Sequence, residues 1–124
     1  DGAHNPHGAA ALAQTLRELD TRAPRPLVLI CGLLTTKDVD GVLAPLARAD
    51  APLIAVPVPS STAAQDPQKL AAIAQSHGFA ATHAPSLLDA MKKAAALPGE
   101  PPRIVICGSL YLAGDALALS GGVR

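Results

Sequence analysis

The chain has 124 residues, a length that suits a single domain with its own buried core. Its 10 Lys and Arg residues balance its 10 Asp and Glu residues, and it contains one Phe, one Tyr and no Trp. Without a basic patch or aromatic rings to stack on bases, nucleic-acid binding is not expected. No apolar run approaches the roughly 20 residues of a membrane span, so no membrane partner is expected.

In the first half of the chain, two helices and two strands are predicted. Apolar residues at helical spacing predict a helix over 6–20. The continuous apolar runs 27–31 and 53–58 have strand length and predict strands covered on both faces. The segment 32–40 between them is predicted to be a polar loop. An apolar stripe over 42–47 predicts the second helix. Because Pro45 falls inside this stripe, the helix is expected to be kinked or to start late.

In the second half, helix-capping residues mark the elements. Asp66-Pro67 is an N-cap followed by a first-turn proline, and Gly78 is expected to close the helix that they begin. A short strand is predicted over 79–83, and Ser86 to Asp89 is a variant of the capping box. The buried stripe of this fourth helix is expected to comprise Leu87, Leu88, Met91 and Ala95. A last strand over 103–107 and a last helix over 109–119 complete the prediction.

Strands that alternate with helices over short loops predict an α/β fold with a Rossmann-like, mainly parallel sheet and helices on both faces. In such folds ligands bind at the carboxyl ends of the strands. Three polar segments lie there or enter helices nearby, namely 1–6, 33–40 and 108–109. We therefore expect these three segments to converge on one site.

The segment Asp1-Gly-Ala-His-Asn-Pro6 carries the strongest signal. Asn5 suits an N-cap and Pro6 the first helical position, so Asp1 and His4 would lie just before a helix N-terminus, where free N–H groups attract anions. The carboxylate of Asp1 can hold hydroxyl groups, and the imidazole of His4 can meet a phosphate or carboxylate. The alternative is a capped helix with a polar lead-in. Because the chain starts without Met, we expect it to begin inside a larger protein.

The segment at Gly108 and Ser109 follows a strand and opens the last predicted helix. Glycine permits a tight turn, and Ser109 can present its hydroxyl and nearby N–H groups to an anion. The alternative is an ordinary strand-to-helix turn. Tyr111 would either line the site or pack against the sheet, and packing is favoured.

The remaining loop places a cation beside acids. Lys37 offers a mobile point charge for a carboxylate or phosphate, and Asp38 is placed to orient it. The alternative is a solvated loop in which Asp38 or Asp40 caps the following helix.

Other residues and missing motifs limit the chemistry. Cys31 and Cys107 each end an apolar run before a glycine, which predicts buried free thiols in a reducing cytoplasm. The patterns GxxxxGK[ST], GxGxxG and GxSxG are absent, so neither a P-loop nor a dinucleotide site nor a serine nucleophile is expected. His4 and His7 lack further ligands, so no metal site is expected.

Three motifs occur in order with strand–helix spacing between them: Asp1-Gly-Ala-His-Asn-Pro, Leu34-Thr-Thr-Lys-Asp38 and Gly108-Ser-Leu-Tyr-Leu-Ala-Gly-Asp115. Together they resemble the C-terminal domain of folylpolyglutamate synthase and of the bifunctional dihydrofolate synthase, members of the Mur ligase superfamily. The resemblance covers essentially the whole chain. In that family the middle loop often reads Asp-Lys-Asp, whereas Thr36 replaces the first acid here.

The resemblance implies an ATP-dependent ligase that adds L-glutamate to folate or dihydropteroate through an acyl phosphate, with Mg²⁺ on the phosphates. The P-loop and the Mg²⁺ ligands would belong to an N-terminal ATPase domain that this chain lacks. Residues 1–124 would then be a single C-terminal domain that acts with that partner and is inactive alone. A cytoplasmic monomer is expected.

The resemblance also implies roles for individual residues. The nucleotide would be bound by Asp1, at its ribose hydroxyls, and by Asn5. His4 would be the catalytic residue and would bind glutamate near the acyl phosphate. The other substrate-binding residues would be Lys37, Asp38, Ser109 and Tyr111. Two other interpretations stay open, a non-catalytic Rossmann-like binding module and the C-terminal domain of a cell-wall Mur ligase, although Gly2-Ala3 and the Gly-Ser-Leu-Tyr motif favour the folate branch.

Overall fold

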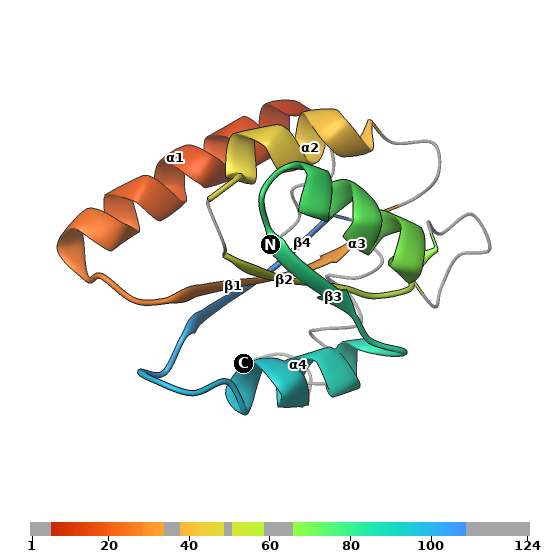
Figure 1. Ribbon diagram of the computed structural model, residues 1–124. Coiled ribbons are helices and arrows are strands. Elements are labelled where there is room, and N and C mark those ends of the chain that lie inside the picture. Colours follow the sequence, from red (N-terminus) through yellow and green to blue (C-terminus); the bar gives the residue numbers. More distant parts are fainter. Residues whose placement is uncertain (1–5, 34–37, 49–50, 59–65, 109–124) are drawn as a thin grey trace, which may run out of the picture.

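The computed structural model describes residues 6–33, 38–48, 51–58 and 66–108, and the structural statements that follow concern these residues. Helices and strands alternate along them (Figure 1). The elements are α1 (Pro6–Arg22), β1 (Leu27–Gly32), α2 (Val39–Leu46), β2 (Pro52–Ala55), α3 (Pro67–Ser76), β3 (Ala80–His83), α4 (Leu87–Ala95) and β4 (Arg103–Gly108). The predicted last helix over 109–119 lies outside the described residues.

The four strands form one parallel sheet in the order β3-β2-β1-β4. Helices α1, α2 and α3 cover one face, and α4 covers the other (Figure 1). The predicted α/β fold, with a parallel sheet and helices on both faces, is therefore confirmed. All four strands end at the same edge of the sheet, because parallel strands run in the same direction.

Two apolar layers hold the sheet between the helices. Successive side chains of a strand point to opposite faces. In β1, Leu29 and Cys31 join the layer under α1, α2 and α3, whereas Val28 and Ile30 join the layer over α4. All six residues of β1 are buried, as its continuous apolar run predicts. Burial of each large aliphatic side chain contributes about 2 kcal/mol, so this central strand organises the core.

The second helix differs from its prediction, because α2 begins early, at Val39. Asp38 is its N-cap and satisfies the Gly41 N–H, so the first turn forms within the segment predicted to be loop. Pro45 lies in the last turn, where it removes one intrahelical N–H donor, and the helix ends one residue later. The predicted late start is wrong.

The second strand is also shorter than predicted. It ends at Ala55, before Pro57, although Val56 and Val58 remain buried beyond its end. The Val56 N–H still donates to the carbonyl oxygen of Cys31 over 2.9 Å. The apolar run therefore marks burial correctly and overestimates the length of the strand.

Helix-capping predictions for α3 and α4 are confirmed. Asp66 caps α3 with Pro67 in the first turn, and Gly78 follows the helix with a φ of 92°. In α4 the Asp89 N–H donates to Ser86 Oγ over 3.1 Å, and the Ser86 hydroxyl donates to Asp89 Oδ2 over 2.9 Å. The capping residues Asp66 and Ser86 thus fix where α3 and α4 begin.

The predicted buried stripe of α4 is partly wrong. Leu87 is buried and Met91 half-buried, but Leu88 is 46% exposed and Ala95 is exposed. Ala90 and Ala94 are buried instead. From Leu87, the first residue after the cap, steps of three and four residues follow one face of the helix, and Leu88 lies on the neighbouring ridge.

Replacing Ser86 with Ala should lower the free energy of unfolding by about 1 kcal/mol, because the Asp89 N–H loses its partner. Urea denaturation of the chain measures the change. Ser86→Thr is the matched control and should keep most of the stability, since it retains a capping hydroxyl. Equal stability of Ser86→Ala and the unmodified chain would contradict the role of this cap.

Candidate functional site

At the carboxyl edge of the sheet, the two central strands end side by side. Gly32 of β1 is the register partner of Gly108 of β4, and Cys31 is the partner of Cys107. The chain leaves this pair toward two of the three predicted polar segments, one after Gly32 and one after Gly108. Those segments therefore start from adjacent points on one edge.

The third predicted segment approaches the same edge through Pro6, the first residue of α1. A Cβ atom built on Gly41 would lie 2.8 Å from the Cγ atom of Pro6 and would also collide with the carboxylate of Asp38. The start of α1 thus packs against the start of α2, and a glycine is needed where they meet. Pro6 and Asp38 bring the segments 1–6 and 33–40 together.

Asp38 holds the start of α2. Its Oδ1 atom accepts a hydrogen bond from the Gly41 N–H over 2.9 Å, and its carbonyl oxygen accepts one from the Val42 N–H over 3.0 Å. The side chain is exposed. Of the two interpretations of this loop, the one in which Asp38 caps the helix is confirmed. The hydrogen bond from a backbone N–H thus holds the Asp38 carboxylate at a defined position beside the edge of the sheet.

The other predicted site residues lie outside the described residues. They are Asp1, His4, Asn5, Lys37, Ser109 and Tyr111. Pro6, Asp38 and Gly108 are the described residues that adjoin Asn5, Lys37 and Ser109 in the chain. The structure therefore brings together the ends of the three segments, and the roles of the individual side chains stay predictions.

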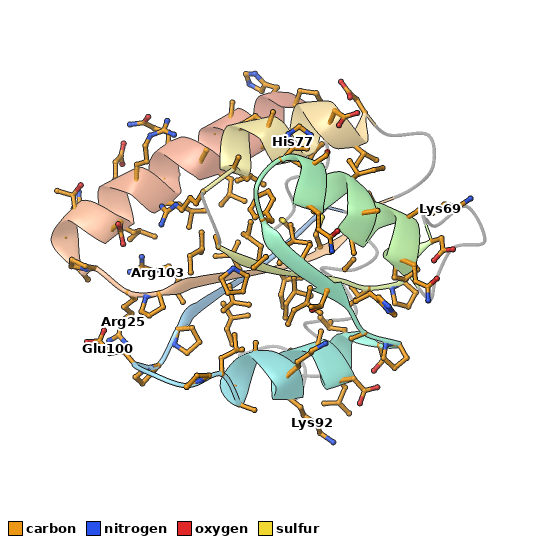
Figure 2. All side chains as sticks on the ribbon, viewed as in Figure 1. Arg25, Lys69, His77, Lys92, Glu100 and Arg103 are labelled. Carbon is orange, nitrogen blue, oxygen red and sulfur yellow. The ribbon has the colours of Figure 1, made fainter. Side chains whose placement is uncertain are left out.

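An ion pair that was not predicted joins α2 to the end of α3. His77, the C-cap of α3, is labelled in Figure 2, and its Nε2 atom lies 2.8 Å from Oδ1 of Asp40. The interpretation of Asp40 as the cap of α2 is wrong, since Asp38 occupies that position. The two residues are 37 positions apart, so no local pattern could have indicated their contact.

The cysteines are free and buried, as predicted. Both lie in the layer beneath α1, α2 and α3, one residue before the paired glycines. A hydrogen bond with the thiol of Cys107, together with burial, raises the pKa of Cys31 well above its ordinary value. Cys31 therefore stays a protonated thiol and packs as a small apolar residue.

Among the described residues, no three His, Cys, Asp or Glu side chains are grouped so that they could hold a metal ion. None of the helices in the described ranges has the length and hydropathy of a membrane span.

Comparison with known proteins decides the family. Residues 1–119 match the family described as dihydrofolate synthetase, C-terminal domain. The chain belongs to this family. It is 36% identical over 118 residues to the folylpolyglutamate synthase of Lacticaseibacillus casei, a match that covers 91% of this chain and 24% of that enzyme. The resemblance found in the three motifs is confirmed.

Solved structures of family members share the fold. Mycobacterium tuberculosis folylpolyglutamate synthase, complexed with ADP and AMPPCP, aligns with a TM-score of 0.79 at 36% identity, over 100% of this chain and 29% of its own. The Thermotoga maritima folylpolyglutamate synthase aligns with a TM-score of 0.74 at 28% identity, over 100% of this chain and 28% of its own. The chain thus spans about a quarter of the length of the relatives it matches.

Gly41→Ala tests the contact between the starts of α1 and α2. Alanine is about 1 kcal/mol better than glycine inside an unobstructed helix. Here its Cβ would collide with the Asp38 carboxylate and Pro6, so we expect a loss of about 1–3 kcal/mol in the free energy of unfolding. Urea denaturation gives the sign directly. A more stable variant would show that α1 and α2 do not meet in this way.

Proposed function

We propose that this chain is the C-terminal domain of an ATP-dependent ligase that adds L-glutamate to folate or dihydropteroate through an acyl phosphate. The match of residues 1–119 to the dihydrofolate synthetase family carries the proposal. The position of the described ends of the three polar segments, at Pro6, Asp38 and the Gly32–Gly108 pair, supports it, since α/β folds bind their ligands at the carboxyl edge of the sheet.

The proposed reaction joins a carboxylate to an amine. The substrate carboxylate receives the terminal phosphoryl group of ATP and becomes an acyl phosphate, and ADP leaves. The amine of L-glutamate then attacks the carbonyl carbon and gives up a proton to water as the amide bond forms, and phosphate leaves with the electrons of the broken C–O bond. ATP with Mg²⁺ supplies the phosphoryl group when bound. Every participant is anionic, so the protein must mainly position and shield charge.

On this proposal the residues of the three segments bind either the nucleotide or the incoming glutamate. Asp1 and Asn5 hold the nucleotide, with Asp1 on the ribose hydroxyls. His4 binds the incoming glutamate beside the acyl phosphate and keeps its amine in line with the carbonyl carbon, and Ser109 and Tyr111 complete that pocket. Lys37 offsets the negative charge of glutamate, and Asp38 borders the same pocket from its fixed position at the start of α2.

The proposed partner is an N-terminal ATPase domain of the same protein. It would supply the P-loop and the Mg²⁺ ligands, and no metal-binding role is assigned to this chain. We propose a monomer in the reducing cytoplasm, in keeping with the two free thiols. The chain alone should therefore form no glutamate adduct.

The test is an assay of the full-length protein with ATP, L-glutamate and either dihydropteroate or tetrahydrofolate. His4→Ala should raise the KM for glutamate about tenfold or more and leave nucleotide affinity within about twofold, because His4 contacts glutamate and not the nucleotide. His7→Ala, exposed at the start of α1, is the matched control and should behave as the unmodified enzyme.

Asp38→Asn separates charge from capping in the same assay. Asparagine caps helices as well as aspartate does, so stability should hold. The KM for glutamate should rise severalfold, because the proposed orientation of the Lys37 ammonium group by the carboxylate is lost. An unchanged KM would limit Asp38 to its structural role. Equal loss of glutamate and nucleotide binding in His4→Ala would contradict the assignment of His4, and absence of turnover in the unmodified protein would contradict the proposed reaction.

A further inference from the structure

A hollow of about 470 Å³ opens at the amino ends of the strands, opposite the candidate site. Its floor is formed by Leu27 and Val28 of β1 and by Pro52 at the start of β2. Its volume falls within the range of about 300–1,000 Å³ typical of small-molecule sites. We call it the amino-edge pocket.

Two loops form the rim of the amino-edge pocket and are held together. The Arg103 N–H donates to the carbonyl oxygen of Pro26 over 2.7 Å, and Arg103 Nη2 donates to the carbonyl oxygen of Ala23 over 2.9 Å. Arg25 and Glu100, one from each loop, lie beside Arg103 at this end of the sheet (Figure 2). The loops before β1 and β4 are thus fixed to each other, and the pocket has a defined wall.

The walls are apolar and poor in backbone donors. Four of the lining residues are prolines, which carry no N–H group: Pro26, Pro52, Pro98 and Pro102. Leu97, which is 38% exposed, extends the apolar surface to the rim. The pocket therefore suits an apolar body, and its strong hydrogen-bond donors are the guanidinium groups of Arg25 and Arg48.

The two guanidinium groups differ in their partners. Arg25 Nη1 donates to the carbonyl oxygen of Pro101 over 3.5 Å. Arg48 is half-buried, and its guanidinium group has no hydrogen-bond or ion-pair partner among the described residues. A guanidinium group partly removed from water favours a carboxylate, which it can bind through two parallel hydrogen bonds. Within the described part of the chain, Arg48 is thus the cation of this pocket that is available for a ligand.

Nearby acids limit the charge of that ligand. Asp20 and Glu100 also line the pocket. Asp20 accepts the backbone N–H of Arg25 over 3.4 Å, and Glu100 is exposed. A ligand with several negative groups would meet these carboxylates, whereas a single carboxylate can reach Arg48 alone.

We propose that the amino-edge pocket binds a small organic monocarboxylate with an apolar body, with the carboxylate on Arg48 and the body against the proline walls. This site lies at the edge of the sheet opposite Gly32 and Gly108 and is separate from the proposed ligase chemistry. Its test needs neither ATP nor glutamate, so its outcome is independent of the proposed function.

The probe is 4-phenylbutyrate, titrated into the chain and followed by backbone amide chemical shifts. The neutral isostere 4-phenylbutan-1-ol is titrated in parallel. We expect the acid to shift amides that line the pocket, including Leu27, Ala51 and Leu97, and to bind about tenfold more tightly than the alcohol. Arg48→Gln should weaken binding of the acid about tenfold and leave the alcohol unchanged, because only the acid uses the guanidinium group.

Lys92→Gln, exposed on α4, is the matched control and should bind the acid as the unmodified chain does. Leu97→Glu is a second test, because Leu97 is a partly exposed lining residue of the pocket. The new carboxylate should repel the acid and abolish its binding. Equal affinity of Arg48→Gln and the unmodified chain would overturn the proposal. So would shifts confined to other regions, or no binding up to about 10 mM.

Discussion

The pairing of β1 with β4 is the constraint on which the rest of the structure depends. Six consecutive residues of one strand align with six of the other, and the alignment ends with Gly32 opposite Gly108. A slip of one residue would move every side chain of β1 to the other face of the sheet. The two apolar layers, which share the residues of β1 alternately, would then both be lost. Core packing thus fixes where two of the three predicted site segments begin.

The contact at Gly41 places the third segment. Asp38, Gly41 and Pro6 form a junction in which a helix cap, a missing side chain and a first-turn proline fit together. Each has a local role in starting its helix, and together they align the starts of α1 and α2. The cap that stabilises α2 is therefore also what holds the proposed substrate-binding loop at the edge of the sheet.

The sequence predicts the elements whose signals are local. Asp66-Pro67, Gly78 and Ser86 act within one turn of their own position, and their helices begin or end as predicted. The continuous apolar run of β1 is also a local signal, and it correctly predicts a strand that is buried on both faces. Features that depend on distant residues were missed or misjudged. Leu88 is apolar yet exposed, because the face that α4 buries is set by the sheet beneath it. The pairing of His77 with Asp40 follows only from the packing of α3 beside α2.

The candidate site was predicted at the level of segments rather than side chains. The rule that ligands bind at the carboxyl ends of parallel strands predicts its position, and the individual side-chain roles stay predictions. Conversely, the amino-edge pocket has no motif, since its residues come from the last turns of α1 and from three separate loops and strand starts. Pockets of this kind are visible only in the folded chain.

We propose that the three segments form one site at the carboxyl edge of the sheet. Amide chemical shifts of the full-length protein, measured with AMPPCP and then with L-glutamate, provide the test. Glutamate should shift amides next to Gly32, Asp38 and Gly108, at one edge of the sheet. Glutamate shifts that cluster instead around Leu27 and Pro52, at the opposite edge, would contradict it.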